Sequence, residues 1–206
     1  MNAPTLAVVL AGGRARRMGG ADKALLPCGD RPLIARVIER VAPQCQAVVV
    51  NANGDPARFE SLGLPVVADA VPGQPGPLAG ILAGMERAAA NRPPFLWLLS
   101  VPCDAPFLPT DLVARLHATA ARSTTPVVRA VSGGQPQHVV ALWLVDLRPA
   151  LRTALGAGVR SVGAWAEARG VADVIFDPAV PGAPDPFLNV NTAAELEAAT
   201  RMSCRN

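Results

Sequence analysis

A single lysine stands out among the residues of this sequence that could do chemistry. The chain has 19 lysine and arginine residues, and Lys23 is the only lysine among them. It comes shortly after the segment 12–20, which holds four glycines and three arginines. Glycines let backbone amides approach an anion closely, and basic side chains add positive charge. This composition favours a polyphosphate-binding loop.

The spacing within this loop leaves a second interpretation open. The loop contains no GxGxxG pattern, and in a Walker A motif a lysine would directly follow the second glycine, where Ala21 and Asp22 intervene. An ordinary connection between a strand and a helix, with a few exposed arginines, would have the same composition. The loop alone therefore does not decide between phosphate binding and a simple surface connection.

Three further polar residues each accompany the end of an apolar segment. Asn51 and Asp69 lie towards the ends of predicted strands, and Asp104 lies where a predicted strand runs into a turn. A carboxylate that faces a phosphate site is a natural magnesium ligand, which makes Asp104 a candidate for that role. Asn and Asp also commonly end strands and form turns, so each residue alone has an ordinary explanation.

The elements that must position these residues alternate between strands and helices. A β-branched apolar run at 5–11 is typical of a strand that is buried on both faces. One apolar face predicts a helix over 31–42, with Asp30 as its N-cap, and Thr110 is the expected cap of a helix at 109–121. The other predicted strands cover 46–53, 64–69, 95–106, 125–131, 139–145 and 172–177, and the other helices cover 76–90, 146–158, 161–170 and 193–201.

This alternation predicts an α/β fold with three α/β/α layers around a Rossmann-like, mainly parallel sheet. The stretch 130–190 is less regular, and we expect an antiparallel strand there. We expect one domain over 1–206, with an N-terminal half of about 1–110 and a C-terminal half of about 111–206. Ligands of open α/β sheets bind outside the carboxyl ends of the strands, so the glycine-rich loop, Asn51, Asp69 and Asp104 should converge at one edge.

Other catalytic arrangements are not evident. The sequence shows no Ser–His–Asp or Cys–His pair, and neither His117, expected on a helix, nor His138, expected just before a strand, is predicted to be catalytic. The three tryptophans lie in apolar runs and are expected in the core. The four cysteines lack the spacing of a zinc or redox motif and are expected to be reduced thiols.

The overall composition excludes several partner classes. The formal net charge is +3 and the arginines are scattered, which argues against a nucleic-acid-binding surface. No apolar run approaches the ~20 residues that a membrane helix needs. The N-terminus lacks the basic region of a signal peptide. We therefore expect a cytoplasmic protein with no nucleic-acid or membrane partner.

The sequence resembles the molybdenum cofactor guanylyltransferases in four segments. "LAGGRARRMGGADKALL" at 10–26 is similar to that family's signature LAGGxSxRMGxDK, with Ala15 where the family usually has Ser; the wider nucleotidyltransferase superfamily shares a looser form. "GPLAGI" at 76–81, "PCDAPF" at 102–107 and "FLNVNT" at 187–192 are similar to its later motifs, in the same order. The resemblance covers about residues 6–196.

The resemblance implies an enzyme that transfers GMP from GTP to molybdopterin with Mg²⁺ and releases pyrophosphate, by direct in-line displacement. The N-terminal half would bind the nucleotide, and the C-terminal half would contribute to the pterin site. Asp104 would coordinate magnesium and, with Arg17 and Lys23, would form the catalytic set. Asn189 and Asn191 would face the pterin, although both could instead cap the last helix. The implied nucleotide-binding residues are Leu10, Ala11, Gly12, Gly13, Lys23, Asn51, Asp69, Gly80 and Asp104.

Several other functions stay open at this point. A molybdopterin cytidylyltransferase or a sugar-phosphate nucleotidyltransferase would share the superfamily signature, although the double glycine Gly12–Gly13 favours guanine, because the cytidine relatives typically have LAAG there. A non-catalytic GTP-binding module that delivers cofactor would need the loop but not Asp104. A Rossmann oxidoreductase is disfavoured by the missing GxGxxG pattern. We expect a monomer or weak homo-oligomer that contacts molybdoenzymes or their chaperones transiently.

Overall fold

A seven-stranded sheet forms the centre of the computed structural model, which describes residues 3–12, 22–71, 73, 76–177 and 185–203. The strand order is β5-β4-β1-β6-β8-β7-β9. The strands are β1 (Thr5–Leu10), β4 (Ala47–Asn51), β5 (Val66–Val67), β6 (Trp97–Pro102), β7 (Val127–Ser132), β8 (Gln135–Leu144) and β9 (Val171–Ile175). Strand β8 pairs antiparallel with both β6 and β7, and the other pairings are parallel.

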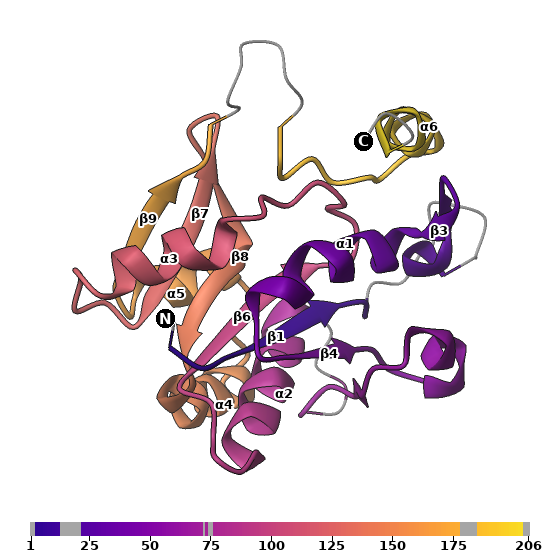
Figure 1. Cartoon of the computed structure of the whole chain (residues 1–206). Coiled ribbons are helices and arrows are strands. Elements are labelled where there is room, and N and C mark those ends of the chain that lie inside the picture. The colour runs from indigo at the N-terminus through magenta and orange to yellow at the C-terminus, as the bar shows by residue number, and fades with distance from the viewer. Residues whose placement is uncertain (1–2, 13–21, 72, 74–75, 178–184, 204–206) are drawn as a thin grey trace.

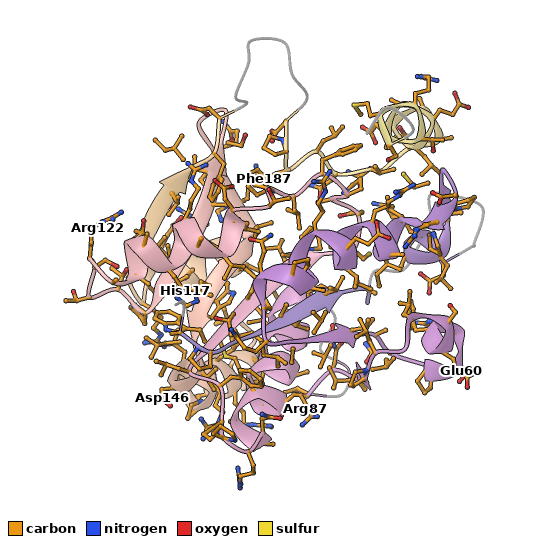
Figure 2. All side chains as sticks on the ribbon, in the orientation of Figure 1. Glu60, Arg87, His117, Arg122, Asp146 and Phe187 are labelled. Carbon is orange, nitrogen blue, oxygen red and sulfur yellow. The ribbon has the colours of Figure 1, made fainter. Side chains whose placement is uncertain are left out.

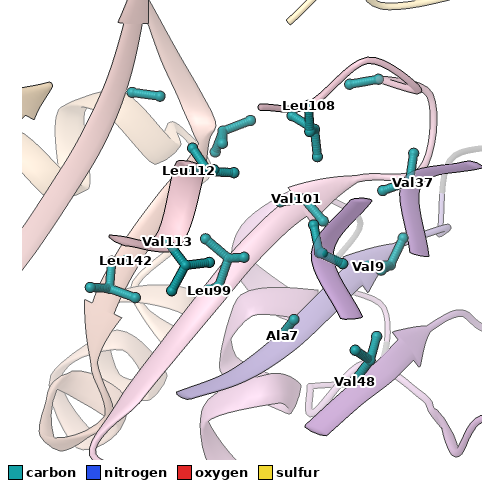
Figure 3. Close-up of a cluster of buried hydrophobic side chains, with 14 of the residues drawn as sticks. Ala7, Val9, Val37, Val48, Leu99, Val101, Leu108, Leu112, Val113 and Leu142 are labelled. Carbon is teal, nitrogen blue, oxygen red and sulfur yellow. The ribbon is translucent and has the colours of Figure 1, made fainter. Parts of the chain in front are cut away.

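Helices cover both faces of this sheet (Figure 1). Helices α1 (Leu33–Val41) and α3 (Leu112–Ala120) pack on one face, and α2 (Pro77–Ala90), α4 (Arg148–Gly156) and α5 (Val162–Glu167) pack on the other. Side chains alternate across the strands, so Ala7 and Val9 of β1 enter the first core, while Leu6 and Val8 enter the second. Figure 3 shows the first core, where strand residues such as Leu99 and Val101 meet Val37 of α1 and Leu112 of α3.

The structure confirms the predicted three-layer fold and the antiparallel strand within 130–190. It also corrects some boundaries. Strand β5 is only two residues long, and β8 begins at Gln135, so His138 lies inside a strand rather than before one. The sheet takes strands from both halves of the chain, because β8 from the C-terminal half pairs directly with β6 from the N-terminal half.

Two predicted helix caps are wrong. Helix α1 starts after Pro32 without a side-chain cap, because the Asp30 carboxylate accepts a hydrogen bond from Arg36 at 2.5 Å instead. Helix α3 starts after Asp111, also without a side-chain cap, so Thr110 does not serve as one. In both places a neighbouring contact or the backbone path decides the start of the helix, and a cap residue in the sequence does not reveal this.

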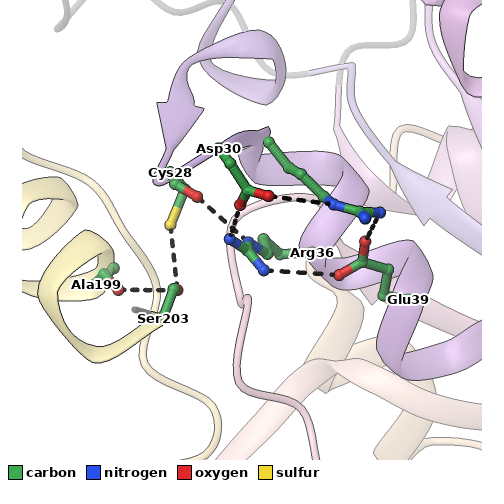
Figure 4. Close-up of polar contacts among 7 residues, drawn as sticks. Cys28, Asp30, Arg36, Glu39, Ala199 and Ser203 are labelled. Atoms are coloured by element: carbon green, nitrogen blue, oxygen red, sulfur yellow. Dashed lines mark hydrogen bonds and ion pairs between the residues drawn. The ribbon is translucent and has the colours of Figure 1, made fainter. Parts of the chain in front are cut away.

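A small hairpin leads from the Lys23 region into α1. The 3₁₀ helix η1 (Lys23–Leu25) is followed by β2 (Pro27–Cys28) and β3 (Arg31–Pro32), which pair antiparallel. The C-terminal helix α6 (Ala193–Ser203) packs against this hairpin through Cys28, Leu33, Val190 and Ala199. Figure 4 shows the polar side of this contact, where the Cys28 thiol lies 3.7 Å from the Ser203 hydroxyl. The end of the chain thus returns to the segment that follows Lys23.

The described residues include no helix with the length and apolarity that a bilayer crossing requires. The three tryptophans are buried as expected: Trp143 of β8 and Trp165 of α5 lie in the second core, and Trp97 of β6 lies in the first core, on the face that α1 and α3 cover. His117 is buried as well, and its Nε2 lies 2.7 Å from the Thr5 hydroxyl (Figure 2).

Candidate active site

The candidate site lies at the edge where β5, β4, β1 and β6 end. These four strands are neighbours and run parallel, so the residues that follow them meet at the same edge. Asn51 ends β4, Asp69 follows β5 and Asp104 follows β6. The predicted convergence of these polar residues at one edge is therefore present.

Lys23 binds two polar residues at this edge, one that follows β6 and one from the C-terminal segment. Its ammonium donates to Oδ2 of Asp104 at 2.5 Å and to Oδ1 of Asn191 at 2.7 Å. The side chains of Lys23 and Asp104 are 19% and 18% exposed, so the ion pair is partly shielded from solvent. One positive charge thus contacts both the carboxylate expected to bind a metal and an amide expected to face the acceptor.

Asp104 is suited to a metal ion. Its Oδ1 is buried and has no hydrogen-bond partner among the described residues, although a buried carboxylate oxygen normally has one. Carboxylate oxygen is a ligand that Mg²⁺ prefers, and Mg²⁺ is typically held by one or two carboxylates together with substrate phosphates. The described part of the chain holds no group of three or more acidic, His or Cys side chains that could form a complete cage. The donor set therefore fits a divalent ion shared with a phosphate ligand.

The cysteine next to Asp104 offers no nucleophile. Burial raises the pKa of Cys103 to about 12, and the neighbouring Asp104 carboxylate acts in the same direction. The thiol is therefore protonated at neutral pH, whereas a nucleophilic cysteine needs a lowered pKa.

A second polar group lies between the ends of β4 and β5. The Asn51 amide donates to Asp69 Oδ1 at 3.1 Å and to the Val67 carbonyl at 3.2 Å. Asn53 donates to Asp69 Oδ2 at 2.7 Å and accepts from the Asp69 backbone amide at 2.9 Å. Both carboxylate oxygens of Asp69 are thus oriented by amides, and a ligand at this edge meets an ordered acceptor.

Gly80 leaves the space that the Asn51 side chain of this group occupies. A Cβ at Gly80 would lie 2.1 Å from Asn51 Oδ1 and 2.7 Å from a methyl carbon of Leu10, which are distances that atoms do not tolerate. Helix α2 can therefore approach β1 and β4 only because this residue lacks a side chain. Gly80 is buried, and the absence of a side chain there leaves room for Asn51.

The start of the glycine-rich loop lies beside Asn51. The Ala11 amide donates to the Asn51 carbonyl at 2.8 Å, and the Leu10 carbonyl accepts from the Cys103 amide at 3.2 Å. Gly12 is exposed, and a Cβ there would lie 3.8 Å from Asn51 Oδ1. Gly13 and Arg17 lie outside the described residues, as do the other glycines and arginines of this loop.

A pocket of about 240 Å³ opens on the other side of Asp104. It contains both asparagines expected at the pterin, and its other lining residues come from β6 and β8, from Asp104 and from the C-terminal segment. The residues that line it are Pro102, Asp104, Gln137, His138, Val139, Val140, Phe187, Asn189 and Asn191. In the strand order, β6, which leads to Asp104, lies between β5 and β4 on one side and β8, which lines the pocket, on the other, so the Asn51–Asp69 group and the pocket flank Asp104.

Neither asparagine side chain caps the last helix. Thr192 Oγ1 accepts from the Glu195 amide at 3.2 Å, and Glu195 Oε2 accepts from the amides of Thr192 and Asn191 at 2.8 and 2.7 Å. This is a capping box, in which the two residues satisfy each other's backbone amides. The hydrogen bond from the Asn191 amide holds the pKa of Glu195 below its usual value. The Asn191 side chain is left to bind Lys23.

Sequence reasoning missed two residues of this edge, Asn53 and Arg58. Arg58 lies in the 3₁₀ helix η3 (Pro56–Leu62), and its Nε is 3.0 Å from Asp22 Oδ2. Asn53 could have been noticed, because it stands at the end of the "NAN" stretch beside Asn51. Arg58 carried no signal, since it is one of many arginines and its partners are distant in the sequence.

Comparisons with known proteins agree with this geometry. Residues 7–171 match the family model of the MobA-like NTP transferase domain. A molybdenum cofactor guanylyltransferase from Rhodopseudomonas palustris is 49% identical over 98% of this chain and 95% of its own length. Another from Bradyrhizobium is 50% identical over 95% of this chain and 92% of its own length.

A solved structure has the same fold. The crystal structure of a molybdopterin-guanine dinucleotide biosynthesis protein A from Archaeoglobus fulgidus superposes with a TM-score of 0.75 at 20% identity, covering 98% of this chain and 100% of that one. The chain therefore belongs to the molybdenum cofactor guanylyltransferases, a family of nucleotidyltransferases.

Proposed function

We propose that this protein transfers GMP from GTP to the terminal phosphate of molybdopterin and releases pyrophosphate. The observation that carries the proposal is the position of Lys23, whose ammonium contacts both Asp104 and Asn191. The nucleotide would lie on the side of Asn51 and Asp69, and the acceptor would lie in the 240 Å³ pocket. The two substrates would then meet at Lys23 and Asp104.

Each part of GTP has a proposed partner. The Asp69 carboxylate is an acceptor for the N–H groups of the nucleoside, and Asn51 and Asn53 hold it in place. Backbone amides at 10–13 would approach the phosphates where glycine leaves room. Lys23 and Arg17 would offset the phosphate charge. Gly80 would act through Asn51, since it lies beneath that side chain.

We propose Mg²⁺ as the metal, held by Asp104 through its buried oxygen and by the phosphates of the nucleotide. When bound, the ion supplies positive charge to the transferring phosphate and to the departing pyrophosphate. Without such compensation, two unit charges at ~4 Å repel by about 4 kcal/mol at an effective dielectric constant near 20. Lys23 is positioned to reduce the same repulsion, because it lies between the two proposed substrate sites.

The chemical step needs no proton transfer. An oxygen of the acceptor phosphate attacks the α-phosphorus of GTP, the new P–O bond forms, and the bond to the β-phosphate oxygen breaks in line with it. The attacking oxygen is already anionic, so a general base is not required. The protein would align the two anions and hold the pyrophosphate oxygens through Lys23 and Arg17, which is positioning and electrostatic stabilisation rather than covalent catalysis.

Pyrophosphate release tests the proposal directly. The protein is incubated with molybdopterin and Mg²⁺ together with GTP, CTP, ATP or UTP in turn. We expect release with GTP that depends on molybdopterin. A preference for CTP would overturn the guanine assignment, and a sugar phosphate that replaced molybdopterin would overturn the acceptor.

The variant Asp104→Ala separates an enzyme from a delivery module. We expect it to abolish transfer in an enzyme, whereas in a module that only binds GTP it would lower only the magnesium-dependent affinity for GTP. Asp146→Ala is the matched control, because Asp146 is 85% exposed and lies at the opposite end of the molecule (Figure 2). Full transfer activity in Asp104→Ala would contradict its role.

The proposed reaction also implies partner proteins for its product. A cytoplasmic enzyme that makes the dinucleotide cofactor must pass it to apo-enzymes or their chaperones, so we propose transient contacts with those proteins. The oligomeric state stays a prediction from the sequence, as does the single domain over 1–206.

A further inference from the structure

Arg58 connects two parts of the candidate site that are distant in the sequence. Its Nε lies 3.0 Å from Oδ2 of Asp22, the residue before Lys23. Its Nη2 donates to the backbone carbonyl of Asn53 at 2.8 Å, and Asn53 is the residue that orients Asp69. One guanidinium therefore links the turn that carries Lys23 to the group around Asp69.

At the Lys23 end of this link, Arg58 contacts the second carboxylate oxygen of Asp22. The Asp22 Oδ1 accepts from the Ala24 amide at 3.1 Å and caps η1, and the second oxygen faces Arg58. Because η1 is only three residues long, few backbone hydrogen bonds of its own define its orientation. Holding both Asp22 oxygens therefore fixes the direction in which Lys23 leaves the backbone.

At the Asp69 end of this link, Arg58 holds the loop that follows β4. The Asn53 carbonyl binds Arg58, while the Asn53 side chain exchanges two hydrogen bonds with Asp69. Gly54 has a φ of +86°, and a Cβ there would lie 3.3 Å from Arg58 Nη1, so the backbone bends closely around the guanidinium. The planar fork of arginine can reach both partners at once, which a lysine ammonium on a flexible stem does less well.

We propose that Arg58 is a positioning residue, which sets Lys23 at a defined place relative to the Asn53–Asp69 pair. This inference rests on the proposed function, in which Lys23 meets the phosphates of GTP and Asp69 meets its nucleoside. Arg58 then sets the distance between Lys23 and the Asn53–Asp69 pair so that both can contact one bound nucleotide. The side chains of the Arg58–Asp22 pair are 33% and 24% exposed, and the guanidinium also lies 4.8 Å from the centre of the Phe59 ring, so thermal stability is measured together with the kinetics.

The test measures kcat and KM for GTP in Arg58→Ala, Arg58→Lys and Asp22→Asn. We expect kcat/KM to fall about tenfold in Arg58→Ala, mostly through kcat, because a misplaced Lys23 no longer aligns the phosphates. Arg58→Lys should recover only part of the loss. Asp22→Asn keeps the cap oxygen but removes the charge partner, and should lose less than Arg58→Ala, because the hydrogen bond from Arg58 to the Asn53 carbonyl remains. The double variant should lose no more than Arg58→Ala alone, since that variant already breaks the contact with Asp22.

Arg152→Ala is the control, because Arg152 also pairs with one carboxylate, Glu86, but on α4 and away from the site. We expect wild-type kinetics from it and a melting temperature close to that of the Arg58 variants. Wild-type kcat in both Arg58→Ala and Asp22→Asn, or losses that add in the double variant, would overturn the inference. If Arg58→Ala does not fold, Asp22→Asn decides. Absence of GMP transfer in the wild type would instead overturn the proposed function.

Discussion

Lys23 is the residue at which the two sides of the candidate site meet. Its ammonium donates to Asp104 at 2.5 Å and to Asn191 at 2.7 Å, and its side chain is 19% exposed. An ammonium is a compact charge, whereas a guanidinium is a broad planar fork. We therefore expect an arginine at this position to hold the two partners less well.

The size of the group can be tested with the charge held constant. We predict that Lys23→Arg lowers kcat for GMP transfer by about 100-fold, because the fork cannot occupy the same place and displaces the phosphates. Steady-state pyrophosphate release measures this. Arg122→Lys is the control for the exchange of one basic residue for another, since Arg122 is exposed and far from the site (Figure 2). Wild-type kinetics in Lys23→Arg would contradict the size argument.

For single residues, the sequence predicted the site residues that follow the strands and missed the residues that position those site residues. The sequence places Asn51, Asp69 and Asp104 after apolar runs, and the parallel topology then brings them together. Arg58 acts through partners on two other segments, so its role depends on tertiary contacts that no local pattern records. The same is true of the Lys23–Asn191 hydrogen bond.

Among the elements, helix α2 is the one whose approach shapes the site. It packs on β1 and β4 with Gly80 and Gly84 facing the sheet. A Cβ at Gly84 would lie 3.0 Å from Val8 and Leu98, within the apolar core, while a Cβ at Gly80 would meet the Asn51 side chain. The two glycines make the same close approach possible, but only one of them borders the site.

This pair gives a matched test of how α2 supports the site. We predict that Gly80→Ala weakens GTP binding by about tenfold or more, because the new methyl group must push Asn51 away from Asp69. Gly84→Ala should lower the melting temperature through strain in the core without changing GTP affinity. Calorimetric titration and thermal unfolding of both variants measure the two effects. Equal GTP affinity in the two variants would contradict the positioning role of Gly80.

The sequence predicted the order of the elements well and their ends less well. Hydrophobic periodicity and strand length gave every large helix and the alternation with strands. The caps at Asp30 and Thr110 failed because Asp30 binds Arg36 and helix α3 begins one residue later than Thr110 would require. The hairpin β2–β3 was missed, since two-residue strands leave no periodicity to detect.

In the whole molecule, the C-terminal segment completes the edge of the sheet. The Val190 amide donates to the Asp104 carbonyl at 2.9 Å, and Phe187 packs edge-on against Phe176 at 5.5 Å. The pocket beside Asp104 is therefore built from β6, β8 and the last described segment together. Folding of the complete chain is what joins the two proposed substrate sites.

Buried titratable groups make the stability of the whole molecule depend on pH. Burial lowers the pKa of His117 and raises the pKa of Cys45 and of Cys103 to about 12. Below about pH 6.5 the unfolded chain binds a proton on histidine that folded His117 resists, so the free energy of unfolding falls as pH decreases. Above about pH 8.5 the unfolded chain loses thiol protons that the folded chain keeps, so it falls again as pH rises.

We therefore predict maximal stability between about pH 7 and pH 8.5, with a limiting slope of about 1.4 kcal/mol per pH unit for each proton on either side. Urea unfolding at pH 5.5, 7.5 and 9.5 measures the curve. His117→Gln should flatten the acid side selectively, because glutamine does not titrate, and should leave the alkaline side unchanged. An acid side as steep in His117→Gln as in the wild type would assign the proton uptake to other groups.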